Sequence, residues 1–263
     1  MRHLRWPLCG FESVRHMQGA TPRIRRTRYA VRNLRYWFAR SALSDLYARR
    51  GRALRVLEVG VDNGDMRCFA GGELINGTRF ALPPWVERWD ALDVKCDPAV
   101  LARYSYSDYI EADVEKLPDG WSRGREYDAI LLLHVLEHLL DPERAMLRLR
   151  AALRPDGILM GGSPTMPSLL AHWHEPYLRR KNAASMHDVR VHKHLSVITP
   201  RRIRRFARAQ GMHVEMLAGA FFLRASGRPW ENSALWIRAN LLWGALFPAL
   251  GGEIYFSLGA APR

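Results

Sequence analysis

Apolar residues near the start of the chain follow a helical spacing. Between residues 22 and 50 they recur every three or four positions, with arginines frequent between them, and Gly51 ends the pattern. Such a period predicts an amphipathic helix. We therefore predict a basic helical extension over residues 1–52, followed by a larger domain over residues 53–263. The apolar stripe consists of Val31, Leu34, Phe38, Ala42 and Leu46.

From residue 53 onward, short apolar runs of strand length alternate with helical patterns. Strands are predicted over residues 53–60, 89–94, 109–114, 127–136, 157–163, 212–218 and 253–259. Helices are predicted over residues 141–153, 200–211 and 233–247. Strands that alternate with helices pair in parallel through right-handed crossovers, which predicts an α/β fold. The pattern leaves the direction of the last strand open, although a reversed strand suits the spacing.

Residues that suit a nucleoside stand where the first three predicted strands end. Glu58 precedes the loop 60–64, whose two glycines let a ligand approach the backbone closely. Asp93 ends the second strand and can accept hydrogen bonds from a ribose diol, and Asp113 ends the third and can accept from an exocyclic amine. Three acidic residues at neighbouring strand ends favour a nucleoside that carries a cation over a diphosphate, whose GxGxxG fingerprint is absent.

These segments resemble the class I S-adenosylmethionine-dependent methyltransferases, especially the small-molecule subgroup related to the ubiquinone-biosynthesis (type 11) methyltransferases. The resemblance extends over residues 56–164, with a further similar segment, HKHLSVITPRRIRRFARAQGMHVE, after it. It implies a Rossmann-like, seven-stranded, mostly parallel sheet with helices on both faces, and S-adenosyl-L-methionine as the cofactor. The matching segments are VLEVGVDNG, ALDV, IEADVEKLP, YDAILLLHVLEHLLDPERAMLRLRAALRPDG and ILMGGSP.

The resemblance also implies which residues surround the cofactor. The glycine loop would lie under the methionine portion, and Asp93 would take the ribose hydroxyls. Asp113, together with Val114, would hold the adenine, and His134 would line the pocket near the sulfonium. The residues assigned to the cofactor are Glu58, Gly60, Asp62, Gly64, Asp93, Asp113, Val114 and His134.

Two features depart from the family pattern. Asp62 stands where the family has its middle glycine, so it either crowds the turn or adds a carboxylate near the ligand. The gap of 29 residues from Gly64 to Asp93 is longer than one helix needs. Residues 66–89 indicate an insertion with two glycine-containing turns, which we expect to reshape the cofactor entrance. Asp90 is the alternative to Asp93 as the ribose ligand.

The letters HVLEH at residues 134–138 also match the H-x-x-E-H signature of zinc proteases. Zinc would need both histidines on one face of a helix, one turn apart, whereas His134 directly follows a buried strand. A magnesium cluster around His187 and His194 is disfavoured because histidine is a poor magnesium ligand. We therefore expect no metal.

Methyl transfer from an activated sulfonium mainly requires that the acceptor lie in line with the methyl group. A hydroxyl acceptor also benefits from a general base, usually histidine or a carboxylate. His138 and His194 lie in segments that we expect to face the pocket, so they are our predicted catalytic residues. The remaining candidates for the base are His172, His174, His187 and His192.

The acceptor site is expected to be formed by the N-terminal segment and by a lid over residues 164–200, which in this fold lie over the pocket. Trp173 and Tyr177 there stand beside the cationic run 179–181, a combination that suits a ligand with a ring or apolar portion and an anionic portion. The chain lacks the D/N-P-P-Y/F motif of base methyltransferases and a cysteine placed for pyrimidine methylation, which disfavours nucleic acid. We predict O-methylation of a small molecule, a sugar, or a glycan- or lipid-linked acceptor.

Charge is distributed unevenly within a net charge of +14. Residues 1–55 carry 14 arginines and two acidic residues, and residues 176–263 carry 14 basic and four acidic residues, whereas the middle is acidic. Basic flanks attract nucleic acid or lipid head groups. The alternative hypothesis is therefore a methyltransferase-fold scaffold whose flanks contact RNA or a membrane.

The expected location is the cytoplasm. The first residues lack a signal-peptide pattern, the longest late apolar run is too short to cross a bilayer, and the three cysteines have no metal-ligand spacing. Peripheral contact with a membrane through the apolar segment 233–247 is compatible with this location.

Overall fold

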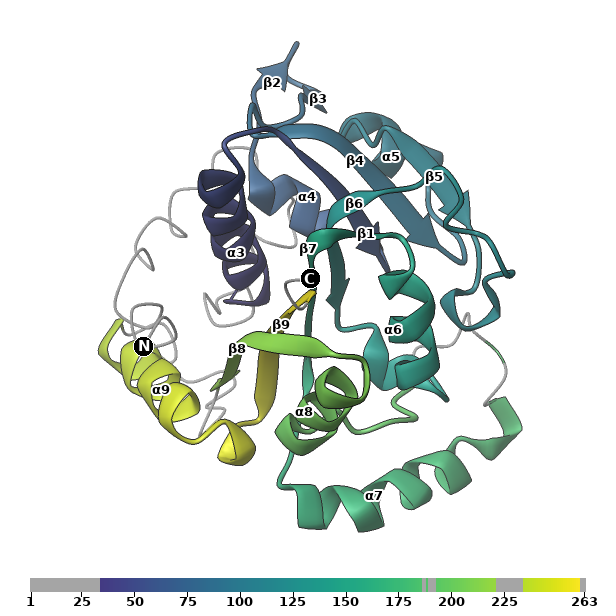
Figure 1. Cartoon of the computed structure of the whole chain (residues 1–263), viewed down its shortest axis with the longest axis vertical. Helices are drawn as coiled ribbons and strands as arrows, with labels where there is room; N and C mark the ends of the chain where they lie inside the picture. Colours follow the sequence, from purple (N-terminus) through teal and green to yellow (C-terminus); the bar gives the residue numbers. More distant parts are fainter. Residues whose placement is uncertain (1–33, 186–187, 189–192, 221–233, 261–263) are drawn as a thin grey trace.

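Seven strands form one mixed sheet in the computed structural model, which describes residues 34–185, 188, 193–220 and 234–260 (Figure 1). Their order is β5-β4-β1-β6-β7-β9-β8, and all neighbours from β5 to β7 pair in parallel. The predicted seven-stranded, mostly parallel sheet is therefore confirmed. The strands are β1 (Leu54–Val59), β4 (Val86–Asp93), β5 (Asp108–Glu111), β6 (Tyr127–Leu133), β7 (Leu153–Pro164), β8 (Met212–Ala220) and β9 (Glu253–Ala260).

The last strand runs against its neighbours. Strand β9 pairs antiparallel with β7 on one side and with β8 on the other. The reversed orientation that the spacing suits is thus the observed one. Because β9 lies between β7 and β8, its first residues stand next to the end of β7, where the parallel strands finish.

Helices cover both faces of the sheet, as Figure 1 shows. One face packs against α3 (Leu34–Arg50), α4 (Asp65–Ala70) and Leu241 of α9 (Ala234–Leu246). The other face packs against α6 (Pro142–Arg150) and α8 (Pro200–Ala209). Successive strand residues point to opposite faces, so Val56 belongs to the first core and Leu57 to the second.

The described part of the predicted N-terminal extension is α3, which lies directly on the sheet. Phe38 and Leu43 of this helix are fully buried, and Phe38 stacks on Tyr255 of β9 with ring centroids 5.1 Å apart. The apolar stripe read from the sequence thus identifies a core-facing helix. Residues 1–33, which include the start of the predicted helix, lie outside the described residues.

Three helices begin at residues that cap them. Asp97, Asp141 and Thr199 each accept a main-chain N–H of the following turn, at 2.8, 3.0 and 3.2 Å respectively. Each is followed by a proline in the first turn, where the missing N–H costs nothing. These caps fix the starts of α5 (Pro98–Arg103), α6 and α8.

The predicted insertion between the first two parallel strands forms a small hairpin. After α4 the chain makes β2 (Leu74–Ile75) and β3 (Arg79–Phe80), which pair antiparallel. The buried guanidinium of Arg67 donates to the main-chain oxygens of Gly71 and Ala81, which ties the hairpin to α4. The chain between β1 and β4 therefore holds the six-residue helix α4 and this hairpin.

The predicted lid contains α7 (Ser168–Lys181) and a short turn, η5 (Ala183–Ser185). Helix α7 runs along one edge of the molecule after β7 (Figure 1). Within the described ranges, no helix combines the length and the apolar character needed to cross a bilayer.

Candidate functional site

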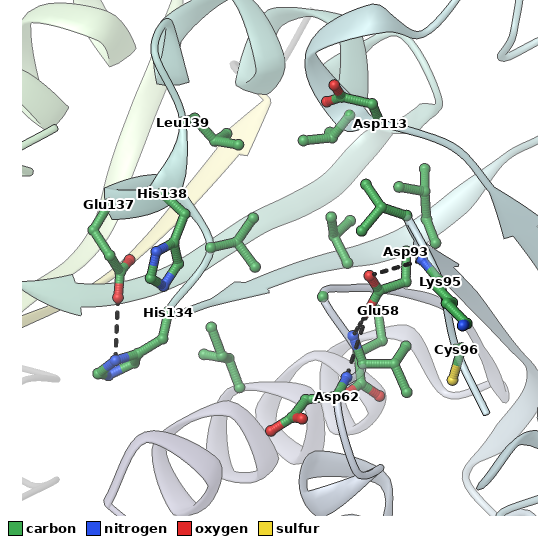
Figure 2. Close-up of a pocket in the computed structure, with 18 of the residues that line it drawn as sticks. Glu58, Asp62, Asp93, Lys95, Cys96, Asp113, His134, Glu137, His138 and Leu139 are labelled. Carbon is green, nitrogen blue, oxygen red and sulfur yellow. Dashed lines mark hydrogen bonds and ion pairs between the residues drawn. The ribbon is translucent and has the colours of Figure 1, made fainter. Parts of the chain in front are cut away.

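A cavity of about 1030 Å³ opens at the carboxyl ends of β1, β4, β5 and β6. Ligands of open α/β sheets bind at this edge. Figure 2 shows two groups of polar side chains in it, with Asp93 and Asp113 on one side and His134, Glu137 and His138 on the other. Within the described lining, Met66 is the one residue that comes from the insertion predicted over residues 66–89, so the expectation that the insertion reshapes this entrance stays a prediction.

The loop after β1 needs glycine for two separate reasons. Gly60 and Gly64 have φ of +75° and +71°, a region that side chains rarely adopt. A Cβ atom on Gly60 would also lie 2.5 Å from a methyl carbon of Val135. Asp62, which replaces the family's middle glycine, adopts φ +49° and is exposed. The turn therefore keeps its left-handed shape and does not close the cavity.

Asp93 joins the end of β4 to this loop. Its Oδ2 accepts the main-chain N–H of Val61 at 2.7 Å and, more weakly, that of Asp62 at 3.4 Å. The alternative residue, Asp90, is buried away from the cavity, where it accepts the hydroxyl of Tyr127 at 2.8 Å. The structure thus favours Asp93 over Asp90 as a residue that can face a ligand.

The buried side chain of Glu58, near the end of β1, lines the cavity next to the loop. Its Oε2 accepts the Trp89 indole N–H at 3.0 Å and the Tyr106 hydroxyl at 2.9 Å. Burial raises the pKa of Glu58 to about 7, although these hydrogen bonds and the nearby Arg67 oppose the rise. Its carboxyl group therefore links β1 to Trp89 of β4.

Asp113 and Val114 line the far end of the same half of the cavity. The Asp113 Oδ1 accepts the main-chain N–H of Glu115 at 2.9 Å, which caps the short turn η3 (Val114–Lys116), and its Oδ2 pairs with Lys116 at 3.0 Å. Val114 is buried and supplies an apolar wall. This end can therefore offer a carboxylate beside an apolar surface.

His134 is held in a strained conformation on the opposite half. It adopts φ +58°, and its main-chain N–H donates to the oxygen of Gly162 at 2.7 Å. Its Nδ1 lies 3.2 Å from Glu137 and its Nε2 lies 3.8 Å from Glu253. Burial lowers the pKa of His134, but the two carboxylates outweigh burial and raise the pKa above its ordinary value.

Glu137 connects this half of the cavity to the lid. Its side chain accepts the hydroxyl of Ser163 at 2.8 Å, and its main-chain oxygen accepts the N–H groups of Leu195 and Ser196. Burial raises the pKa of Glu137, but the contact with His134 lowers it by more. The pKa therefore lies below its ordinary value, and the carboxyl group stays ionised. The sequence HVLEH contains Glu137, but the only function that this motif indicates by itself is that of a zinc protease.

The two predicted catalytic histidines come together at the cavity wall. The rings of His138 and His194 are T-shaped with centroids 5.2 Å apart. The His138 Nδ1 lies 2.6 Å from the main-chain oxygen of Lys193. Because a carbonyl oxygen only accepts, Nδ1 carries the hydrogen and Nε2 is the basic nitrogen of the neutral ring.

One oxygen of Glu137 and one ring nitrogen each of His138 and His194 lie within 4.8 Å of one another. Such a set could hold a metal ion. Ser163 and His134 already bind the carboxylate of Glu137, however. A carboxylate has about four lone-pair sites, so these two contacts leave room for an ion, and the expectation of no metal stays a prediction.

The side chains of the lid do not lie where we expected them. We expected Trp173, Tyr177 and the cationic run 179–181 to form the acceptor pocket. Both aromatic side chains are exposed and lie outside the cavity lining. Arg179 instead donates to the main-chain oxygens of Leu140 and Leu195 and pins the lid in place. The described lid residues that line the cavity are Asp188, Lys193, His194 and Leu195.

Arg35 is a cavity residue that the sequence did not single out. It projects from α3, and its Nη2 donates to the Tyr36 hydroxyl at 2.9 Å. Its Nε is buried and makes no hydrogen bond within the described part of the chain. Burial lowers the pKa of Arg35, but Tyr36 and Glu253 raise it more, so the guanidinium stays charged.

A family model described as "Methyltransferase domain" matches residues 23–217. Several solved structures share the fold at low sequence identity. The CurJ carbon methyltransferase matches with a TM-score of 0.53 and 16% identity over 89% of this chain; the chain spans 56% of that protein's length. No curated protein matches the chain in sequence.

Two further structures match over most of both chains. A candidate methyltransferase from Bacillus halodurans C-125 has a TM-score of 0.51 and 15% identity, covering 84% of this chain and 100% of its own. A candidate sarcosine dimethylglycine methyltransferase from Galdieria sulphuraria has a TM-score of 0.50 and 13% identity, covering 86% and 85%. At these identities the likeness concerns the fold alone.

Proposed function

This chain belongs to the methyltransferase domain family, and from that premise we propose that it methylates an oxygen atom of a small acceptor with an anionic portion. It is an enzyme that uses S-adenosylmethionine. The acceptor classes that we propose are a small molecule, a sugar, or a glycan- or lipid-linked compound. Support comes from the cavity, whose two halves offer different chemistry.

The half around the β1 loop fits the cofactor. Gly60 lines the cavity and has no side chain between its backbone and the space, so a ligand can approach that backbone closely. Glu58, Gly60, Asp62 and Gly64 would then surround the methionine portion. When bound, the cofactor supplies a methyl group on an already activated sulfonium.

The ends of β4 and β5 would hold the nucleoside. A carboxylate has about four lone-pair sites, so Asp93 can accept ribose hydroxyls while its Oδ2 still binds the loop amides. Asp113 would accept from the adenine amine, against the apolar wall of Val114. His134 would lie on the sulfonium side.

The acceptor half combines cations with a base. Arg35 and Lys193 line it, and Lys193 is buried. The guanidinium of Arg35 is partly buried, and its Nε makes no hydrogen bond among the described residues, which favours an anionic group on the acceptor. In this proposal His138 takes the proton of an acceptor hydroxyl at Nε2 as the oxygen gains its methyl group, and the ring of His194 next to it supports this role.

The observation that carries this proposal is the contact of His138 Nδ1 with the oxygen of Lys193 at the cavity wall. It fixes the tautomer that a base needs. The alternative was a scaffold protein whose basic flanks contact RNA or a membrane, and its best support was Asp62. Asp62 is exposed and leaves the cavity open, which favours the enzyme over the scaffold.

The first experiment is calorimetric titration of the purified protein with S-adenosylmethionine and S-adenosylhomocysteine, with NAD as the control. We expect both sulfur compounds to bind and NAD not to bind. Acceptors would then be screened with an isotopically labelled methyl donor, and the methylated atom would be identified by NMR. Labelling only of nitrogen or carbon would refute the oxygen acceptor while leaving the cofactor site intact.

A further inference from the structure

Helix α7 exposes an unusual number of large apolar side chains. Leu169 and Trp173 are 76% and 74% exposed, and Leu170 and Tyr177 are more than half exposed. Their spacing of three and four residues places them along one side of the helix. Single exposed apolar residues are ordinary, whereas a continuous stripe marks an interaction surface.

A second exposed apolar group follows at the end of α9 and in the turn η7 (Pro248–Leu250). The two groups are neighbours because the Thr165 N–H donates to the oxygen of Gly252 at 3.0 Å, just before α7 begins. In Figure 1, α9 lies at the lower left and α7 runs along the bottom, with α8 between them in this view. We call their exposed side chains the apolar rim: Leu169, Leu170, Trp173, Tyr177, Leu242, Leu246, Phe247 and Leu250.

Formal charge is missing from both parts of the apolar rim. Residues 163–174 and residues 239–252 contain no aspartate, glutamate, lysine or arginine. The neighbouring helix α8 has the opposite character, with five arginines and no acidic residue in ten positions. It contacts η7, and its Arg202 binds Glu175 of α7 at 2.8 Å.

The remaining arginines of α8 face solvent, and we call them the basic strip: Arg201, Arg204, Arg205 and Arg208. Arg180 and Lys181 add exposed positive charge at the end of α7. Apolar and cationic surfaces therefore lie side by side on elements that touch each other. Their combination decides which kind of partner fits.

We propose that the apolar rim and the basic strip dock this protein on an anionic phospholipid surface. Leucine, tryptophan and tyrosine enter the head-group boundary, while arginines bind anionic head groups. RNA would use the basic strip but leave the apolar rim in water. A second copy of the chain would bury the apolar rim but bring two basic strips together.

Docking places the cavity edge close to the lipid. Strand β7 ends at the same edge of the sheet as the cavity, and Arg179 of α7 donates to the oxygen of Leu195, which lines it. If the proposed methyl transfer is right, an acceptor carried by a lipid would reach the site from this side. The docking itself is independent of that activity.

Vesicle flotation of the full chain tests this inference. Vesicles of phosphatidylcholine alone are compared with vesicles that also contain phosphatidylglycerol, without cofactor or acceptor. We expect binding to the anionic vesicles that weakens as salt is added. Leu169→Ser with Trp173→Ser should weaken binding by about tenfold per residue, and Arg204→Gln with Arg208→Gln by about fivefold per charge.

Matched controls come from exposed residues elsewhere. Leu147→Ser on α6 and Arg123→Gln should bind vesicles like the parent chain. S-adenosylhomocysteine affinity, measured on every variant, reports whether the fold is kept. The proposal is overturned by absent binding to anionic vesicles, by equal loss in the controls, by RNA binding in place of vesicle binding, or by a dimer that Trp173→Ser dissociates.

Discussion

The ring nitrogen Nδ1 of His138 lies 2.6 Å from the main-chain oxygen of Lys193. The lid segment that carries Lys193 is itself held by Glu137, whose main-chain oxygen accepts two N–H groups from it. The residue that we propose as the base and the lid segment that we propose as a wall of the acceptor site therefore hold each other in place. A change in either should affect the reaction more than the fold.

His138→Ala should lower kcat with a hydroxyl acceptor by about 10²- to 10⁴-fold, the usual contribution of a general base. Affinity for S-adenosylhomocysteine should change little, because His138 stands on the acceptor half of the cavity. Steady-state kinetics and calorimetry measure the two effects separately. His172→Ala is the control, since that exposed side chain lies outside the cavity lining; an equal kcat loss in both variants would contradict the role of His138.

Asp113→Ala should weaken binding of S-adenosylhomocysteine by roughly ten- to a hundredfold, the cost of losing a hydrogen bond to a charged group. Glu111→Ala is the matched control, because Glu111 is exposed two residues earlier and does not line the cavity. Calorimetry gives both affinities, and thermal unfolding checks whether loss of the η3 cap contributes. Unchanged affinity in Asp113→Ala would remove that residue from the cofactor site.

Gly60→Ala should destabilise the fold and weaken cofactor binding together. The new side chain is strained at a φ of +75°, and its Cβ also collides with Val135. Gly51→Ala separates these causes, because Gly51 has φ +63° but no neighbouring atom lies within 4 Å of the place that its Cβ would take. We expect Gly51→Ala to cost about 1 kcal/mol of unfolding free energy and Gly60→Ala clearly more, with urea titration as the measurement.

The sequence predicted those parts of the molecule that depend on local pattern. Strand-length apolar runs place β1 and β4, and the pair Thr199 and Pro200 fixes the start of α8. The carboxyl ends of consecutive parallel strands must meet at one edge, so the sequence alone predicts that Asp93 and Asp113 lie at the same cavity. Local spacing and sheet topology carry that information.

Contacts between distant segments could not be read in the same way. Arg35 faces the cavity because α3 packs across the sheet, yet in sequence it is one arginine among many. Trp173 and Tyr177 were expected to point inward, but α7 is oriented so that both side chains are exposed to solvent. Both outcomes depend on helix rotation, which the single sequence left undetermined.

Glu58→Gln should alter how stability depends on pH. Because the pKa of Glu58 rises from 4.5 to about 7 on folding, the native state binds more protons than the unfolded state between these values. The free energy of unfolding therefore falls with rising pH, by about 3 kcal/mol from this group. Glutamine still accepts from Trp89 and Tyr106 but does not titrate.

Urea unfolding of both proteins at about pH 5 and about pH 8 measures this difference. The fall in stability should be smaller in Glu58→Gln than in the parent chain. The raised pKa of His134 also lowers stability as pH rises, but it does so in both proteins and cancels in the comparison. Identical falls would mean that Glu58 has an ordinary pKa.

Arg35→Ala should raise KM for an anionic acceptor by roughly ten- to a hundredfold, since it removes a charged hydrogen-bond donor from the cavity wall. Arg40→Ala is the matched control, because Arg40 is exposed on the same helix. Affinity for S-adenosylhomocysteine should stay unchanged in both. With a neutral analogue of the acceptor, KM should be the same for Arg35→Ala and for the parent chain, because the guanidinium then has no negative charge to bind. If the neutral and anionic acceptors respond alike, Arg35 supports the fold rather than acceptor recognition.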